Sequence, residues 1–136
     1  MKIENIKFRG KSKRTGEWLY GDLVRNVEGV FAIVPPFEMT TDNLCDRYEV
    51  DENTIGQFTR MYDSAGREIY EGDILMCKAG RFVVQIDTDA ARFMVSPAAL
   101  YNSVYVNEAS FTLSYNSIAY WFSICGNIHD NAELLN

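Results

Sequence analysis

Apolar and aromatic positions along the chain gather in short stretches, separated by turns rich in Gly, Asn and Asp about every 8 to 12 residues. Aromatic and β-branched residues fit a pleated, half-buried surface, so these stretches predict strands. The predicted strands cover residues 17–24, 30–34, 57–61, 69–70, 74–77, 82–86, 92–95, 104–106, 111–115 and 118–125. We expect a mainly β fold, with a small barrel- or sandwich-like sheet and at most short helical turns.

The first part of the chain, residues 1–53, predicts an N-terminal β-meander. A polar loop at residues 9–16 and a turn at residues 26–29 separate its strands. Two prolines at 35–36 end the last of these strands, because proline cannot donate a hydrogen bond within a sheet. Residues 54–136 then form a larger β-rich core. We expect both parts to belong to one domain of 136 residues.

Three segments predict short helical turns or leave two structures open. Residues 40–43 can cap a short helix over 44–48, but Tyr48 and Val50 alternate with charged neighbours, which favours a strand there. Ser96 and Pro97 are typical of a helix start. Asn131 can cap a final helical turn. The apolar run at residues 118–125 predicts a central strand.

Turn residues are densest between residues 54 and 74. Asp63-Ser64-Ala65-Gly66 predicts a type I turn, in which Asp63 accepts a backbone hydrogen bond and Gly66 takes a positive φ. Residues 71–73 predict a second reversal. We expect the acids of this stretch to cap turns in contact with solvent; they are Asp63, Glu68, Glu71 and Asp73.

Composition and charge narrow the class of protein. The hydrophobic content of 47% indicates an ordered globular chain. No apolar run approaches about 18 residues, so we expect no membrane association by a spanning segment. The first residues lack the apolar core of a signal peptide, which predicts a cytoplasmic protein. The net charge of −6 disfavours a general binder of phosphate backbones.

The charge is unevenly distributed, because six basic residues and only one acid, Glu4, lie within residues 2–14. This basic arm could contact nucleic acid or an acidic partner. The alternative is a solvated hairpin whose lysines protect a sheet edge from pairing, and we favour this alternative. The candidate nucleic-acid contacts are Lys7, Arg9, Lys11, Lys13 and Arg14.

The chain lacks the residue patterns of common catalytic and metal sites. It has one histidine, His129, and no Cys-x-x-Cys pair or phosphate-binding glycine loop. Its three cysteines are odd in number and widely spaced, which predicts free thiols in a reducing compartment. Glu71 and Asp73 could share a strand face for acid–base chemistry, but a turn explains them better. We expect no catalytic residue, no metal and no cofactor.

Aromatic residues are the remaining candidates for a binding surface. They concentrate in the last part of the chain and could pack in the core, anchor a protein interface or stack on bases. The sequence leaves the choice between core and exposed surface open. The residues are Tyr101, Tyr105, Phe111, Tyr115, Tyr120, Trp121 and Phe122.

Five segments resemble a known family. Residues 49–59 read Glu-Val-Asp-Glu-Asn-Thr-Ile-Gly-Gln-Phe-Thr, and residues 63–74 read Asp-Ser-Ala-Gly-Arg-Glu-Ile-Tyr-Glu-Gly-Asp-Ile. Together with residues 7–10, 18–23 and 126–135, they are similar to the YopX family, whose members are small proteins encoded mostly by bacteriophages and prophages. The resemblance covers nearly the whole chain.

The resemblance implies a mostly β protein of phage origin in the cytoplasm of a bacterial host, and it implies no reaction. We therefore expect a non-catalytic β-rich protein-binding module that self-associates and contacts host or phage proteins. The alternatives are a nucleic-acid-binding protein and a carboxylate-dependent enzyme. The recurring residues of the family motif have structural reasons to recur; here they are Gly56, Gln57, Thr59, Asp63, Gly66, Tyr70, Glu71, Gly72, Asp73, Gly126 and Asn127.

Overall fold

The computed structural model describes residues 2–36, 38, 43–104, 106–114 and 121–136. The fold is mainly β, as predicted, and its strands form two five-stranded antiparallel sheets. The strand orders are β3-β2-β1-β4-β5 and β10-β6-β7-β8-β9. Neither order returns to its first strand, so neither sheet closes into a barrel. The chain divides into two units, Met1–Phe58 and Thr59–Asn136.

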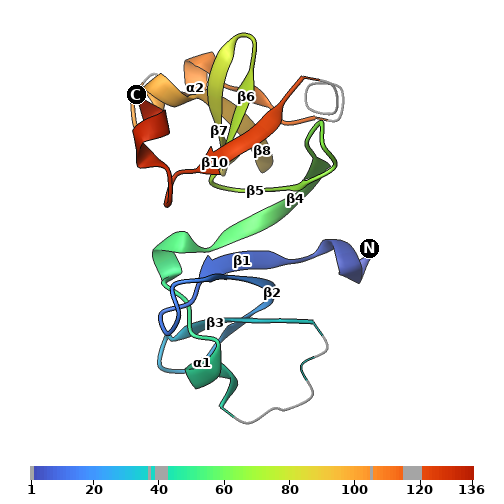
Figure 1. Cartoon of the computed structure of the whole chain (residues 1–136), viewed down its shortest axis with the longest axis vertical. Coiled ribbons are helices and arrows are strands. Elements are labelled where there is room, and N and C mark those ends of the chain that lie inside the picture. Colours follow the sequence, from blue (N-terminus) through green and yellow to red (C-terminus); the bar gives the residue numbers. More distant parts are fainter. Residues whose placement is uncertain (1, 37, 39–42, 105, 115–120) are drawn as a thin grey trace. The chain divides into compact units, whose positions relative to one another are not determined.

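The first unit contains the predicted β-meander (Figure 1). Its elements are η1 (Ile3–Asn5), β1 (Phe8–Lys11), β2 (Trp18–Arg25), β3 (Phe31–Val34), α1 (Leu44–Arg47), η2 (Glu52–Thr54) and the start of β4 (Gly56–Tyr62). The predicted loop at residues 9–16 is shorter than expected, because β1 continues to Lys11. The cause is cross-strand pairing, which places Lys11 opposite Trp18.

The segment between β3 and β4 combines the two structures that the sequence left open. Residues 44–47 form the short helix α1. Val50 then bridges to Ser12, and Glu49 bridges to Ala32 on β3. The preferred strand is therefore reduced to two isolated bridges, one to β3 and one to Ser12 just after β1. Residues 40–42, proposed as helix caps, lie outside the described residues.

The second unit is built on the second sheet. Its elements are the end of β4, β5 (Glu68–Tyr70), β6 (Asp73–Cys77), β7 (Gly80–Asp87), β8 (Arg92–Pro97), η3 (Ala98–Leu100), α2 (Val106–Ala109), β9 (Phe111–Thr112), β10 (Ser123–Asn127) and η4 (Ala132–Leu135). One buried cluster joins Leu75, Val84 and Val95 to Phe122. A second joins Ile74, Val83 and Ala98 to residues of η4. Both faces of the β6–β7 hairpin are thus covered.

Several predicted elements of the second unit need correction. Residues 123–127 form β10 at an edge of the sheet, whereas the sequence predicted a central strand over 118–125. Residues 118–120 lie outside the described part of the chain. The strand predicted at 104–106 is wrong, because helix α2 begins at Val106. The strand predicted at 111–115 is described only over Phe111–Thr112.

The two predicted helix starts form tight 3-10 turns and differ from the expected caps. Ser96 remains in β8, where its hydroxyl donates to Gln85 Oε1 at 2.9 Å, and Pro97 precedes η3. Asn131 precedes η4, but its side chain does not cap that turn. The three cysteines are free, as predicted, and each is half-buried.

Candidate functional site

The Asp63 carboxylate is the centre of the strongest sequence motif and is fully buried. Its Oδ1 accepts the backbone N–H of Ala65 at 3.0 Å and that of Arg67 at 2.8 Å, which forms the predicted turn. Its Oδ2 accepts the Arg67 side-chain Nε–H at 2.9 Å. The expectation of a turn cap is therefore confirmed. The expectation of a solvent-exposed carboxylate at position 63 is wrong.

Residues from a distant part of the chain complete the Asp63 environment. The backbone N–H of Ile124 donates to Asp63 Oδ2 at 2.9 Å, and Arg67 Nη2 donates to the Ile124 carbonyl at 2.9 Å. Burial acts to raise the pKa of Asp63, but the hydrogen bonds from Ile124, Arg67 and Ala65 outweigh it, so the pKa lies below its ordinary value. Asp63 is therefore ionised at neutral pH.

The turn over residues 63–67 forms hydrogen bonds along the outer edge of β10. Besides the two bonds to Ile124, the backbone N–H of Ser64 donates to the Phe122 carbonyl at 2.9 Å. These are edge groups of the kind that an additional strand would take. The side chains of Asp63 and Arg67 thus make hydrogen bonds that a neighbouring strand would otherwise make. We call this arrangement, made by Asp63, Ser64 and Arg67, the edge clamp.

The second reversal contains Asp73, which is also buried. Asp73 Oδ2 accepts the backbone N–H of Tyr70 at 2.7 Å, and Gly72 has a φ of 92°. The expected solvent exposure of Asp73 is wrong, because its carboxylate, like that of Asp63, is buried and accepts a backbone N–H. Glu71 is half-buried. The pKa of Tyr101 is raised first by the burial of Tyr101 and second by the negative charge of Glu71. Glu71 and Asp73 thus act on different neighbours.

The C-terminal part of the family motif forms a compact asparagine network. Asn127 Oδ1 accepts the backbone N–H groups of His129 at 3.0 Å and Asp130 at 2.9 Å. Asn131 Oδ1 accepts the backbone N–H of Asn127 at 3.1 Å. A Cβ on Gly126 would lie 2.5 Å from that Asn131 oxygen, which explains the glycine. The backbone N–H of His129 thus belongs to this turn.

The remaining motif residues lie in β4 and its turn. Gly56 is buried at the start of β4, opposite Arg9, and Gln57 is opposite Phe8. Thr59 Oγ1 donates to the Ile69 carbonyl at 2.8 Å. Gly66 has a φ of 79° and closes the Asp63 turn.

The structure does not present the five basic candidates as one exposed arm. Arg9 is buried, and its guanidinium lies 4.7 Å from the Trp18 ring centroid. Lys7 and Lys11 are half-buried and lie over aromatic rings. Lys13 and Arg14 are exposed in the following turn. The sequence did not reveal the ring contacts, because they depend on cross-strand register.

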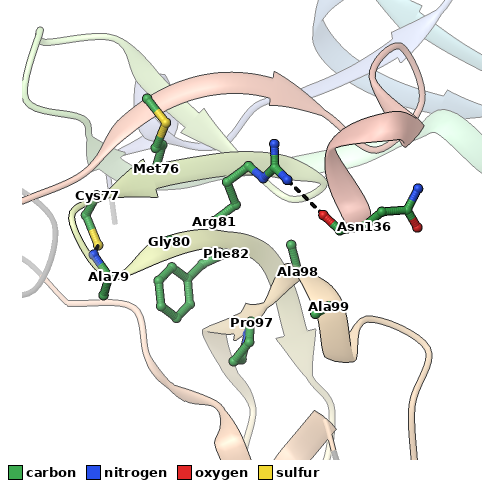
Figure 2. Close-up of a pocket in the computed structure, with 10 residues that line it drawn as sticks. All are labelled: Met76, Cys77, Ala79, Gly80, Arg81, Phe82, Pro97, Ala98, Ala99 and Asn136. Carbon is green, nitrogen blue, oxygen red and sulfur yellow. Dashed lines mark hydrogen bonds between the residues drawn. The ribbon is translucent and has the colours of Figure 1, made fainter.

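An open pocket of about 590 Å³ lies at the end of the β6–β7 hairpin. Figure 2 shows Arg81 reaching over it to Asn136, whose main-chain oxygen accepts from Arg81 Nη2 at 2.8 Å. Apolar side chains of Met76, Phe82 and Pro97 line the pocket, and Met76 is 47% exposed. The sequence pattern did not predict this pocket. Its one local signal was an apolar Met76 near the end of a strand.

The C-terminal aromatic residues divide between core and surface. Phe122 is buried and packs edge-on against Phe82, with ring centroids 5.4 Å apart. Phe111 stacks on Phe122 and is partly exposed, whereas Trp121 is 68% exposed. Tyr101 is half-buried. The other three aromatic candidates, Tyr105, Tyr115 and Tyr120, lie outside the described residues.

Across the part of the chain that the structure describes, no group of three or more His, Cys, Asp or Glu side chains is arranged to hold a metal ion. Among the helices of the described residues, none is long and apolar enough to cross a membrane.

These observations define a mainly β protein of two units, in which the buried Asp63 carboxylate and the exposed Arg67 side chain hydrogen-bond to the edge strand β10. The family model described as YopX protein matches residues 7–136. The chain therefore belongs to the YopX family, as its motifs predicted. A search of curated proteins gave no match.

Proposed function

We propose that this YopX protein is a non-catalytic binding module that associates with a second copy of itself through the open pocket of its second unit. The observation that carries the proposal is the position of Met76. Its side chain lines the pocket and is also 47% exposed beside it. An exposed apolar side chain next to an apolar pocket suits a two-fold interface, in which each copy inserts the same residue into the other.

The chemistry of the pocket supports an apolar anchor. Phe82, Pro97 and Ala98 supply apolar surface, and Arg81 supplies one charged group at the rim. Methionine is flexible and polarizable, so it fills irregular apolar cavities well. A few central apolar residues carry most of the binding energy in such interfaces. The module would act in the cytoplasm of a bacterium that carries the phage or prophage, and host or phage proteins are its further partners.

Sedimentation equilibrium of the full chain between about 1 and 100 µM tests self-association. Met76→Glu places a charge in the proposed interface, so we expect the dimer dissociation constant to rise at least about tenfold. Ala99→Glu, at an exposed position lining the same pocket, should have a similar effect.

Val104→Glu is the matched control, because Val104 is 88% exposed and does not line the pocket. It should leave association unchanged. A wild-type chain that stays monomeric throughout this range contradicts the proposal. So does an equal loss of association in the Met76 and Val104 variants.

A further inference from the structure

One face of the β1–β2 hairpin alternates basic and aromatic side chains. The strand register places Arg9 opposite Tyr20 and Lys11 opposite Trp18. Directly opposite residues of an antiparallel pair share a face, so these four side chains lie together. We call this set the basic–aromatic face.

The ring contacts on this face orient the cations and leave their charges in place. Arg9 and Lys11 lie 4.7 and 5.7 Å from the Trp18 ring centroid. A cation–π contact attracts the cation to the ring without removing its charge. Arg9 is only 5% exposed, so it supports the Trp18 ring and adds to the local positive potential. Lys11 is half-buried and lies nearer the exposed turn.

Exposed groups lie on this face and in the turn that follows β1. Tyr20 is 45% exposed. Lys13 and Arg14 are exposed in the turn after β1. Lys13 also lies 4.0 Å from Glu49, a distance and exposure at which an ion pair contributes little. Phosphate groups can therefore compete with Glu49 for Lys13.

We propose that the basic–aromatic face binds single-stranded nucleic acid, with bases stacking on Tyr20 and Trp18 and phosphates contacting Lys11, Lys13 and Arg14. Charge complementarity and rings on one face together favour this occupant. A single strand exposes the flat faces of its bases, whereas a duplex buries them. An acidic peptide would use the cations and leave the rings unused. The proposal is independent of the Met76 pocket, which lies in the other unit.

The overall negative charge sets the expected character of the binding. A net charge of −6 opposes a polyanion at long range, whereas residues 2–14 carry six basic groups and one acid. The attraction is therefore local and is screened by salt. We expect modest affinity that falls about tenfold or more between about 50 and 200 mM NaCl.

Tryptophan fluorescence of the full chain provides a direct test. The chain has two tryptophans, so Trp121→Phe leaves Trp18 as the single reporter. Oligothymidine of about 15 nucleotides should quench Trp18 fluorescence when a base stacks on it. A duplex of the same length and polyglutamate are the comparison ligands. Circular dichroism confirms that each variant is folded.

Three variants test the named contacts. Lys13→Glu and Arg14→Glu should each weaken oligothymidine binding about tenfold and lower the salt slope by about one. Tyr20→Ala should also weaken binding about tenfold, because stacking on an aromatic residue contributes about 1 to 3 kcal/mol per base. Lys78→Glu carries the same charge change at an exposed position in the second unit and should leave binding unchanged.

The proposal is overturned by absence of oligothymidine binding at about 50 mM NaCl. It is also overturned if polyglutamate or the duplex binds as tightly as oligothymidine, because the rings would then contribute nothing. Equal effects of Lys13→Glu and Lys78→Glu would mean that only net charge matters. The proposal is supported if oligothymidine quenches Trp18 fluorescence and both Tyr20→Ala and Lys13→Glu weaken its binding. Lys78→Glu should leave that binding unchanged.

Discussion

Asp63 Oδ2 accepts the backbone N–H of Ile124 at 2.9 Å, although 61 residues separate them in the sequence. The same carboxylate fixes its own turn through Ala65 and Arg67. One side chain therefore couples a local hairpin turn to the last strand of the sheet. The family motif around Asp63 thus has a structural role in the edge clamp.

Replacing Asp63 should destabilise the protein strongly. Asp63→Ala removes the acceptor of three backbone N–H groups, those of Ala65, Arg67 and Ile124. Buried donors without an acceptor are costly, so we expect the free energy of unfolding to fall by about 3 kcal/mol. Urea denaturation measures this change. Asp89→Ala makes the same charge change at an exposed turn residue and should alter stability by less than about 0.5 kcal/mol.

Arg67→Lys separates charge from geometry in the edge clamp. Lysine keeps the positive charge but cannot bond Asp63 and the Ile124 carbonyl with two fixed nitrogens. We expect a loss of about 1 kcal/mol in the same urea experiment. Wild-type stability in this variant would show that charge alone holds the clamp.

The ionisation of Asp63 should make stability depend on acid pH. The folded-state pKa lies below the ordinary value of 3.8, so the carboxylate contributes stability at every pH above that value. The contribution is lost as pH falls through the lower, folded-state pKa. Wild-type unfolding free energy should therefore decrease steeply below about pH 4. The decrease should be shallower in Asp63→Asn, and parallel curves for the two proteins would contradict this assignment.

The sequence pattern predicted those elements whose structure depends on residues only a few positions apart. The strands near residues 17–24, 30–34 and 82–86 and the Asp63 turn all follow from alternation and turn residues within a few positions. The burial of Asp63 did not follow, because it depends on the backbone of Ile124. The edge position of β10 did not follow from the sequence either. The apolar run that includes β10 resembles a central strand, because the edge clamp covers the outer edge of β10.

The candidate surfaces show the same division between local and distant causes. The sequence revealed the charge of Lys7, Arg9 and Lys11, but their positions over rings depend on the pairing of β1 with β2 and β4. The Met76 pocket arises where the β6–β7 hairpin meets η3 and the last residue. No single stretch of sequence contains that arrangement.

Gly21 should be the least replaceable glycine of the β-meander. Its φ is 154°, and a Cβ at this position would lie 1.9 Å from the Val34 carbonyl oxygen. That backbone oxygen belongs to β3, so it cannot move without disturbing the β2–β3 pairing. We expect Gly21→Ala to cost more than about 4 kcal/mol or to prevent folding, as judged by circular dichroism.

Gly29→Ala is the control for this prediction. Gly29 has a φ of 82°, but a Cβ there would meet nothing within 4 Å. Its cost should be limited to the backbone penalty of about 1 to 2 kcal/mol. Equal stability of the two variants would mean that the contact with Val34 is not the cause.

Truncation to alanine should destabilise the protein strongly at position 122 and have little effect on stability at position 121. Phe122 is buried between Phe82 and Phe111, so Phe122→Ala leaves a cavity and should cost about 3 to 5 kcal/mol. Trp121 is 68% exposed, so Trp121→Ala should change the free energy of unfolding by less than about 0.5 kcal/mol. Urea denaturation followed by circular dichroism compares the two without relying on tryptophan fluorescence. A large loss in the Trp121 variant would instead indicate that this ring is covered, as it would be in an assembled oligomer, and dilution of the wild-type protein should then lower its stability as well.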